Sequence, residues 1–416
     1  MDSYIVPSEI RGSIKAPPSK SMTQRAIAAA LLAGGESTII NPSHCDDSVV
    51  AMNIASALGA EIRSESDRLF ITGSGQIKDH QLNCGESGLA IRMFSPIAAL
   101  NDVEITMTGR GSLTKRPMSM IEDALGQLGV KCKSNGGFLP VKIKGPLKGG
   151  TCKTDGSLSS QLLTGLLMAL PVAEKDSVVI VNNLKSKPYI DMTLQVLERF
   201  GINIHRKDYT SFHIPGNQIY QPRSFEVEGD WSGGAFLLAA GAINGDITVE
   251  GLRPDSRQSD KAILDVLDSA GARTTILENS ISVKRSLLKP FFFDATESPD
   301  LFPPLVAIAA YCPGISTIKG VSRLIHKESN RSRALVTEFG KLNISIETEG
   351  DNMMVKGGNV TGGEISSHGD HRIAMAAAVA ALGASGKIMI RESHCVAKSY
   401  PEFFDDLRHL GTMLYE

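Results

Sequence analysis

Residues 16–35 combine cations and hydroxyls at the expected start of a helix. Two prolines are followed by Ser19, Lys20 and Ser21, and Arg25 comes before a run that is entirely apolar. A serine at this place can accept hydrogen bonds from the exposed N–H groups of the first turn. Lysine and arginine there oppose the helix dipole, whose N-terminal end is already positive. The pattern therefore predicts an anion-binding helix start; the alternative is an ordinary capped helix whose two cations point into solvent.

The same design recurs along the chain about every 70 residues, which indicates an internal repeat. A polar start precedes an Ala- and Leu-rich run near Lys20, Gly85, Asp155, Gly229, Ser298 and Gly369. A second marker has the same period, because an apolar residue followed by glycine is typical of a helix C-terminus. These pairs are Leu58-Gly59, Leu128-Gly129, Phe200-Gly201, Ala270-Gly271, Phe339-Gly340 and Leu410-Gly411.

A short strand rich in β-branched residues is predicted between the two markers of every copy. These strands cover residues 37–40, 103–108, 177–181, 246–250, 316–319 and 387–391. The first helix of each copy is apolar nearly all round, so it must be buried on every side. Six such α/β units are too many for one core, and we expect two domains of three units. The proline in Gln221-Pro222-Arg223 indicates the crossing between them.

Bulk properties exclude several classes of protein. The 416 residues carry a formal net charge of −2 and only 5% aromatic side chains, which disfavours nucleic-acid binding. The six cysteines contain no C-x-x-C pair, so we expect a reducing compartment and no zinc or other metal site. The N-terminus lacks a secretory pattern, and the apolar runs are too short to span a bilayer. We therefore expect a soluble cytoplasmic protein.

Further motifs place charged or hydroxyl side chains at loop ends and helix starts. Lys327 and Arg331 would lie on one helical face and would repel each other unless an anion sits between them. The alternative is that Glu328 and other carboxylates neutralise them. The hydroxyl-rich segment 155–161 can bind a phosphate or merely cap its helix. Asp300 lies on a rigid turn between prolines, and taken alone it is more typical of a helix cap.

Two glycine-containing segments, Gly73-Ser74-Gly75 and Gly109-Arg110-Gly111, lack the spacing of nucleotide-binding motifs and are interpreted as turns. His371, taken alone, is more typical of a structural than a catalytic residue. Seven cations of this nearly neutral protein lie at loop ends or expected helix starts. Their clustering predicts binding of one or two polyanionic small molecules. These cations are Lys20, Arg25, Arg116, Lys327, Arg331, Arg372 and Lys398.

Together these motifs resemble those of the 5-enolpyruvylshikimate-3-phosphate synthases, over nearly the whole chain from about Pro7 to about Leu410. The matching segments are Pro18-Ser19-Lys20-Ser21 with Arg25, Lys115-Arg116-Pro117, Asp155-Gly156-Ser157 with Ser159-Ser160-Gln161, Ser186-Lys187-Pro188-Tyr189-Ile190-Asp191, Lys327-Glu328-Ser329 with Arg331, Asp370-His371-Arg372, and Lys398. The resemblance implies an α/β fold of two similar domains, each with three β-α-β-α-β-β repeats about a pseudo-threefold axis. It assigns residues 18–227 to the N-terminal domain and residues 1–17 with 228–416 to the C-terminal domain.

The resemblance also implies a reaction. The 5-hydroxyl of shikimate 3-phosphate attacks C2 of phosphoenolpyruvate and phosphate leaves, giving the enolpyruvyl ether used in chorismate and aromatic amino acid biosynthesis. The residues implied for shikimate 3-phosphate are Lys20, Ser21, Arg25, Ser159, Ser160, Gln161, Ser186, Asp300 and Lys327. Those implied for phosphoenolpyruvate are Lys20, Gly88, Arg116, Gln161, Arg331, Arg372 and Lys398.

The chemistry needs a ring of cations around two phosphates and two carboxylates, and it needs a base and an acid. We assign Asp300 as the base for the hydroxyl, and Glu328, assisted by Lys20, as the acid at the methylene carbon. No metal or organic cofactor is implied, and a monomer is expected. Gly88 leaves room for glyphosate beside phosphoenolpyruvate, so inhibition by glyphosate is predicted.

This sequence departs from the family pattern at a few places. Glu86 replaces a common Asn, Leu89 replaces a common Thr, and Arg323 replaces an Asn that often contacts the shikimate phosphate. Leu89 and Met93 bear on the strength of glyphosate inhibition.

Three rival classes of protein share part of this pattern. The nearest is a UDP-N-acetylglucosamine enolpyruvyl transferase, but the loop at residues 111–117 lacks the reactive Cys of that family. A second is a catalytically silent anion-binding relative, against which every position assigned to the chemistry is filled. A third is an RNA-end-processing relative with a similar repeat fold, which the low basicity and the few aromatic residues disfavour.

Overall fold

The computed structural model describes residues 1–73 and 76–415, so the turn predicted at Gly73-Ser74-Gly75 lies in part outside the described residues. The chain divides into two compact units. The N-terminal unit comprises Pro18–Val227, and the C-terminal unit comprises Met1–Pro17 together with Glu228–Glu416. The crossing falls a few residues after Gln221–Arg223, because the short strand that follows them still pairs within the N-terminal unit.

The N-terminal unit contains three four-stranded sheets among its described residues. In sheet order they are β14 (Ser224–Glu226), β3 (Glu36–Ile40), β5 (Arg68–Thr72) and β4 (Glu61–Glu65); β6 (Gln81–Asn83), β7 (Glu104–Thr108), β9 (Phe138–Lys144) and β8 (Lys131–Asn135); and β10 (Thr151–Asp155), β11 (Ser177–Asn182), β13 (Ser211–Ile214) and β12 (His205–Lys207). In each sheet the first pair is parallel and the other two pairs are antiparallel.

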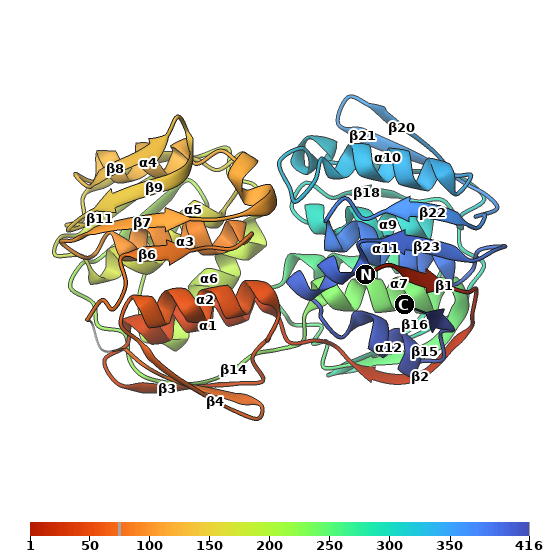
Figure 1. Ribbon diagram of the computed structural model, residues 1–416, viewed down its shortest axis with the longest axis horizontal. Coiled ribbons are helices and arrows are strands. Elements are labelled where there is room, and N and C mark those ends of the chain that lie inside the picture. The colour runs from red at the N-terminus through yellow and green to blue at the C-terminus, as the bar shows by residue number, and fades with distance from the viewer. Residues whose placement is uncertain (74–75, 416) are drawn as a thin grey trace. The chain divides into compact units, whose positions relative to one another are not determined.

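The C-terminal unit repeats this topology with three more sheets in its described part. They are β2 (Ile10–Lys15), β15 (Gly245–Glu250), β17 (Ser280–Lys284) and β16 (Arg273–Ile276); β18 (Phe292–Asp294), β19 (Gly314–Lys319), β21 (Asn352–Gly357) and β20 (Ser345–Glu349); and β22 (Gly363–Ser366), β23 (Ile388–Arg391), β1 (Ser3–Ile5) and β24 (Leu414–Tyr415). In the last sheet β1 lies between β23 and β24, so both ends of the chain complete the sixth repeat (Figure 1).

Two strands lie in the unit opposite to the helix that follows them. β2 precedes the first helix of the N-terminal unit but pairs in parallel with β15 of the C-terminal unit. β14 precedes the first helix of the C-terminal unit but pairs in parallel with β3 of the N-terminal unit. Each crossing of the chain therefore supplies the parallel edge strand that completes the first sheet of a unit.

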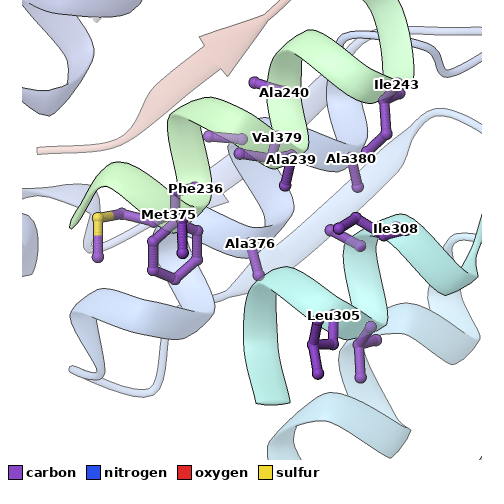
Figure 2. Close-up of a cluster of buried hydrophobic side chains, with 14 of the residues drawn as sticks. Phe236, Ala239, Ala240, Ile243, Leu305, Ile308, Met375, Ala376, Val379 and Ala380 are labelled. Carbon is purple, nitrogen blue, oxygen red and sulfur yellow. The ribbon is translucent and has the colours of Figure 1, made fainter. Parts of the chain in front are cut away.

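The apolar runs form the inner helices of the two units. They are α1 (Lys20–Leu32), α3 (Gly88–Ala98) and α5 (Gln161–Ala169) in the N-terminal unit, and α7 (Trp231–Asn244), α9 (Phe302–Ala309) and α11 (His371–Ala381) in the C-terminal unit. Every residue of α3, α9 and α11 is buried, as all-round apolarity requires. Figure 2 shows Phe236 of α7, Leu305 of α9 and Met375 of α11 in one packed cluster.

The amphipathic helices cover the outside of each unit. They are α2 (Asp46–Ala57), α4 (Ser119–Gln127), α6 (Lys187–Arg199), α8 (Ile263–Ser269), α10 (Arg331–Lys341) and α12 (Phe403–His409). Short 3₁₀ turns complete the connections: η1 (Gly111–Lys115), η2 (Leu170–Val172), η3 (Ser259–Ala262), η4 (Pro299–Leu301), η5 (Val321–Leu324) and η6 (Ser393–Lys398). The repeat, the inner helices and the six predicted strands are thus confirmed, with bounds that differ by one or two residues.

The predicted helix end at Phe339-Gly340 is wrong, whereas the other five glycines have the positive φ expected after a helix. Helix α10 runs through Gly340 to Lys341, and Leu342 caps it. Asn343, with φ of 67°, takes the left-handed position that glycine takes elsewhere. Asparagine tolerates this conformation better than other residues with a side chain, so it can replace glycine in this role.

Candidate active site

The start of α1 bears out the capping prediction and corrects the interpretation of its cations as solvated. The side chain of Ser19 accepts a hydrogen bond from the backbone N–H of Met22, at 3.4 Å. Lys20 is the first residue of the helix, and its Nζ lies 3.0 Å from Oδ2 of Asp47 on α2. The anion that offsets the unfavourable dipole interaction is thus a carboxylate of the protein itself.

Arg25 is buried and connects three helices of the N-terminal unit. Its Nε donates to Oγ1 of Thr193 on α6 at 2.9 Å, and Nη2 lies 3.4 Å from Oγ1 of Thr164 on α5. Nη1 donates to the backbone carbonyl of Ser21 at 2.8 Å. Burial lowers the pKa of Arg25 to about 10, so the group is still charged at neutral pH. The guanidinium connects α1, α5 and α6.

Three residues predicted to bind phosphoenolpyruvate meet at the start of α3. Gly88 is the first residue of that helix, and Ser87 caps it through a hydrogen bond from Ala90 N. A Cβ built on Gly88 would lie only 2.6 Å from Nη1 of Arg116 and 3.4 Å from Oε1 of Gln161. Close approach of these side chains to the backbone therefore requires glycine here.

Glu86 anchors the loop that carries Arg116 through hydrogen bonds with Ser112. Oε2 of Glu86 accepts hydrogen bonds from both N and Oγ of Ser112, at 3.4 and 3.2 Å. An Asn, which is common in the family at this position, has only one side-chain oxygen acceptor. Both bonds end on the same oxygen of Glu86, so the second carboxylate oxygen is not needed for these two contacts.

The hydroxyl-rich segment before α5 serves in part as a cap for that helix. Oγ of Ser159 accepts from the backbone N–H of Gln161 at 3.1 Å, and Asp155 accepts from Ser157 N at 2.8 Å. Ser160 is buried at the helix start. Ser186 has a positive φ of 57° immediately before α6 and is 5% exposed.

In the C-terminal unit the cations gather around Asp300 on η4. Oδ1 of Asp300 lies 3.1 Å from Nζ of Lys327 and 2.9 Å from Nη1 of Arg331, and Oδ2 lies 3.2 Å from Nη2 of Arg372. Burial alone would raise the pKa of this carboxyl, but Arg372, Lys327 and Arg331 hold it well below its ordinary value. Asp300 is therefore a paired carboxylate, and the interpretation as a simple helix cap is wrong.

Lys327 does not share a helical face with Arg331, because α10 begins only at Arg331. Both cations nevertheless contact the same oxygen of Asp300, so an anion does sit between them. Burial lowers the pKa of Lys327, and the nearby Arg323 acts in the same direction while Asp300 opposes it. The arginine that departs from the family pattern thus lies close enough to influence this cluster.

Arg331 is fully buried and contacts three carboxylates. Besides Asp300, its Nη2 donates to Oε2 of Glu328 at 2.7 Å, and its Nε donates to Oδ2 of Asp370 at 3.0 Å. Burial would lower the pKa of Arg331, but these three carboxylates raise it above its ordinary value. Lys398, at the end of η6, places Nζ 3.9 Å from Oε1 of Glu328.

Sequence reasoning missed several groups that hold the predicted residues in place. Asp47 pairs with Lys20, and Arg92 of α3 donates to Oε1 of Gln161 at 2.8 Å. Arg92 is a cation inside an apolar run, and that exception to the pattern was the available signal. Asp47 offered no such signal, because pairing across 27 residues depends on the fold.

Asp260 on η3 is a further buried carboxylate that was missed, and it accepts a hydrogen bond from Oγ of Ser232. Burial and the charge of Asp300 raise the pKa of Asp260 to about 6. Within the described residues, no group of His, Cys, Asp and Glu is arranged to hold a metal ion. Over the same residues, no helix has the length and apolarity needed to cross a membrane.

Structural comparison first defines the class of protein. The EPSP synthase of Acinetobacter baumannii superimposes with a TM-score of 0.84 at 26% identity, and all of both chains is covered. The enolpyruvyl transferase NikO from Streptomyces tendae has the same fold, with a TM-score of 0.81 at 19% identity over 100% of this chain and 98% of that one. The chain therefore has the enolpyruvyl transferase fold.

Sequence comparison then defines the family. The family model for EPSP synthase (3-phosphoshikimate 1-carboxyvinyltransferase) matches residues 6–407. The 3-phosphoshikimate 1-carboxyvinyltransferase of Clostridium perfringens is 40% identical over 99% of this chain and 98% of its own. That of Clostridium acetobutylicum is 39% identical over 99% of this chain and 98% of its own. The chain belongs to the EPSP synthase family, so the predicted fold and 3-phosphoshikimate 1-carboxyvinyltransferase activity are confirmed, and UDP-N-acetylglucosamine is not favoured as the acceptor.

Proposed function

We propose that the residues described above bind shikimate 3-phosphate and phosphoenolpyruvate as the family resemblance implies. The observation that carries the proposal is the set of buried or partly buried cations at helix starts and loop ends, of which Lys20, Lys327, Arg331, Arg372 and Lys398 lie beside carboxylates and Arg25 beside hydroxyl and carbonyl groups. The residues assigned to shikimate 3-phosphate are Lys20, Ser21, Arg25, Ser159, Ser160, Gln161, Ser186, Asp300 and Lys327. Those assigned to phosphoenolpyruvate are Lys20, Gly88, Arg116, Gln161, Arg331, Arg372 and Lys398.

Asp300 is proposed as the base that takes the proton of the 5-hydroxyl while the oxygen attacks C2 of phosphoenolpyruvate. Its low pKa keeps it ionised at neutral pH, as a base requires, but also makes it a weak proton acceptor in the unliganded protein. Bound phosphate and carboxylate groups would share the charge of Lys327, Arg331 and Arg372. The proton affinity of Asp300 would then rise when the substrates are present.

Glu328, assisted by Lys20, is proposed to deliver a proton to the methylene carbon during addition. Elimination then returns that proton and releases phosphate, so that the enolpyruvyl ether forms. In the unliganded protein, Oε2 of Glu328 lies 2.7 Å from Nη2 of Arg331. Substrate anions that compete for Arg331 would let Glu328 take up a proton.

The test is phosphate release from phosphoenolpyruvate, measured separately with shikimate 3-phosphate and with UDP-N-acetylglucosamine as acceptor. Release with the first alone is expected. Asp300→Asn should lower kcat by at least about 100-fold, within the range that positioned general bases contribute. Glu328→Gln should slow deuterium exchange into the methylene carbon, and unchanged turnover in this variant would remove Glu328 from the acid role.

We further propose that residues 18–227 and residues 1–17 with 228–416 act as two domains, and that the protein is a cytoplasmic monomer. The six free cysteines support a reducing compartment. Light scattering coupled to size-exclusion chromatography should give the mass of one chain, 44.4 kDa. A mass twice as large would contradict the monomer.

A further inference from the structure

Arg92 of α3 joins two residues of the N-terminal unit that the proposed function assigns to phosphoenolpyruvate. Its Nη1 donates to Oε1 of Gln161 at 2.8 Å, and its Nη2 donates to the backbone carbonyl of Pro117 at 3.2 Å. Pro117 directly follows Arg116, so one guanidinium connects the loop of Arg116 with the start of α5. Arg92 is only 5% exposed, which makes its position well defined by packing.

The contact with Arg92 decides which end of the Gln161 amide can meet a ligand. A guanidinium has donors only, so the atom that faces it must be the amide oxygen. Nε2 lies on the opposite side of the amide carbon and can only donate. An amide held in this way presents an N–H to an anion, whereas the flipped amide would present an oxygen and repel it.

The backbone at Gly88 marks where these groups converge. A Cβ built on Gly88 would lie 2.6 Å from Nη1 of Arg116, 3.1 Å from Nη1 of Arg92 and 3.4 Å from Oε1 of Gln161. Two guanidinium groups so close together repel each other, and a nearby anion offsets that repulsion. The N-terminal end of α3 adds to the attraction for an anion through the helix dipole.

We propose that Arg92 is a positioning residue for phosphoenolpyruvate: it fixes the amide of Gln161 with Nε2 toward the substrate, and it holds the Arg116 loop through the carbonyl of Pro117. This inference rests on the proposed binding roles of Gln161 and Arg116. It adds a residue that acts through both of them. The expected signature is unequal: Arg116 is assigned to phosphoenolpyruvate alone and Gln161 to both substrates, so the effect on phosphoenolpyruvate should be clearly the larger one.

The first experiment compares steady-state constants of Arg92→Met with the unchanged protein and with Arg199→Met, an exposed control on α6. The KM for phosphoenolpyruvate should rise at least about tenfold in Arg92→Met, because displacement of catalytic groups by about 1 Å costs up to about 100-fold. The KM for shikimate 3-phosphate should rise several-fold less than that, because only Gln161 of the two positioned residues is assigned to it. Equal changes in both constants, or none in either, would overturn the proposal.

A double-mutant cycle tests whether Arg92 acts through the amide. If it does, Arg92→Met combined with Gln161→Ala should be barely worse than the more damaging single change, whereas multiplied effects would contradict coupling. Gln161→Glu keeps an acceptor for Arg92 but places a second oxygen where Nε2 was. Its KM for phosphoenolpyruvate should therefore rise, and normal binding would show that the donor is not needed.

Two further measurements separate the causes of failure. Arg92→Lys keeps the charge but can donate well to only one of the two acceptors, so it should show the same selectivity to a smaller extent. If the thermal midpoint shows that Arg92→Met does not fold, the Arg92→Lys variant is used in its place. Absence of phosphate release by the unchanged protein would refute the proposed function itself, which keeps that outcome distinct from a failure of the Arg92 inference.

Discussion

Replacement of Arg331 by methionine should strongly destabilise the C-terminal unit. The guanidinium is fully buried and contacts the carboxylates of Asp300, Glu328 and Asp370 at 2.7–3.0 Å. Removal of one partner from a buried ion pair costs about 3–5 kcal/mol, because it leaves the other charge without compensation. Lys327 and Arg372 remain beside Asp300, but Asp370 has no exposed surface and loses a direct partner. We therefore expect a loss near the upper end of that range.

The assay can be confined to the relevant unit, because the single tryptophan, Trp231, is buried in α7 of the C-terminal unit. Its fluorescence during urea unfolding should show a lower midpoint for Arg331→Met, and the thermal midpoint should fall by about 6–20 °C. Arg333→Met is the matched control, since Arg333 is exposed on the same helix. It should change stability by less than about 0.5 kcal/mol.

The pH dependence of the loss tests its electrostatic cause. The pKa of Asp300 is depressed in the folded protein, so its ion pairs contribute stability above its unfolded pKa and lose it as the pH falls through the folded value. Without Arg331 the stranded carboxylates can instead be neutralised by protons. The stability deficit of Arg331→Met should therefore be largest near about pH 7 and shrink toward about pH 4. An unchanged midpoint at neutral pH, or a deficit independent of pH, would refute this reasoning.

Three further predictions concern other parts of the two units. Gly88→Ala should raise the KM for phosphoenolpyruvate about tenfold or more, because the added carbon would lie 2.6 Å from Arg116; an unchanged KM would contradict this. Glyphosate should compete with phosphoenolpyruvate and inhibit Gly88→Ala less strongly, so noncompetitive inhibition would reject a shared site. Burial would raise the pKa of Glu338, but hydrogen bonds from Lys341, Ser366 N and His368 lower it. Glu338→Gln should therefore lose about 1–3 kcal/mol at neutral pH, a difference that should disappear in urea titrations below about pH 4.

The repeat could be predicted because its signals are local. An all-round apolar helix, a capping serine and a following glycine each act within a few residues, and their recurrence reinforces each one. The helix end at Phe339-Gly340 was predicted wrongly because the same local signal was used. An apolar residue before glycine indicates a helix end only when that glycine has a positive φ. Asn343, three residues later, has that conformation, and single-sequence patterns rank asparagine below glycine for it.

The candidate site was predictable as residue types but not as contacts. Lys20, Arg116 and Arg331 stood out as cations at helix starts and loop ends, where they cost stability. Their partners could not be identified, because the sequence gives no distance between Lys20 and Asp47, or between Arg331 and Asp370. Arg92 was overlooked because a long apolar run was interpreted as core throughout, although a buried arginine in such a run must have acceptors.

The unliganded protein resolves the conflict between anion binding and stability by supplying its own carboxylates. Both interpretations of the Lys327–Arg331 segment are therefore partly right: an anion does sit between the cations, and it is Asp300. A carboxylate in this position keeps the cations apart and oriented before a substrate arrives, and so it lowers the cost of folding around them. The same carboxylate opposes a second anion, so any anion that binds these cations must be attracted more strongly than Asp300 repels it. If Asp300 has the proposed role of base, it would be poorly basic in the free protein and would become effective when substrate anions draw the cations away, which would couple proton transfer to complete occupation of the site.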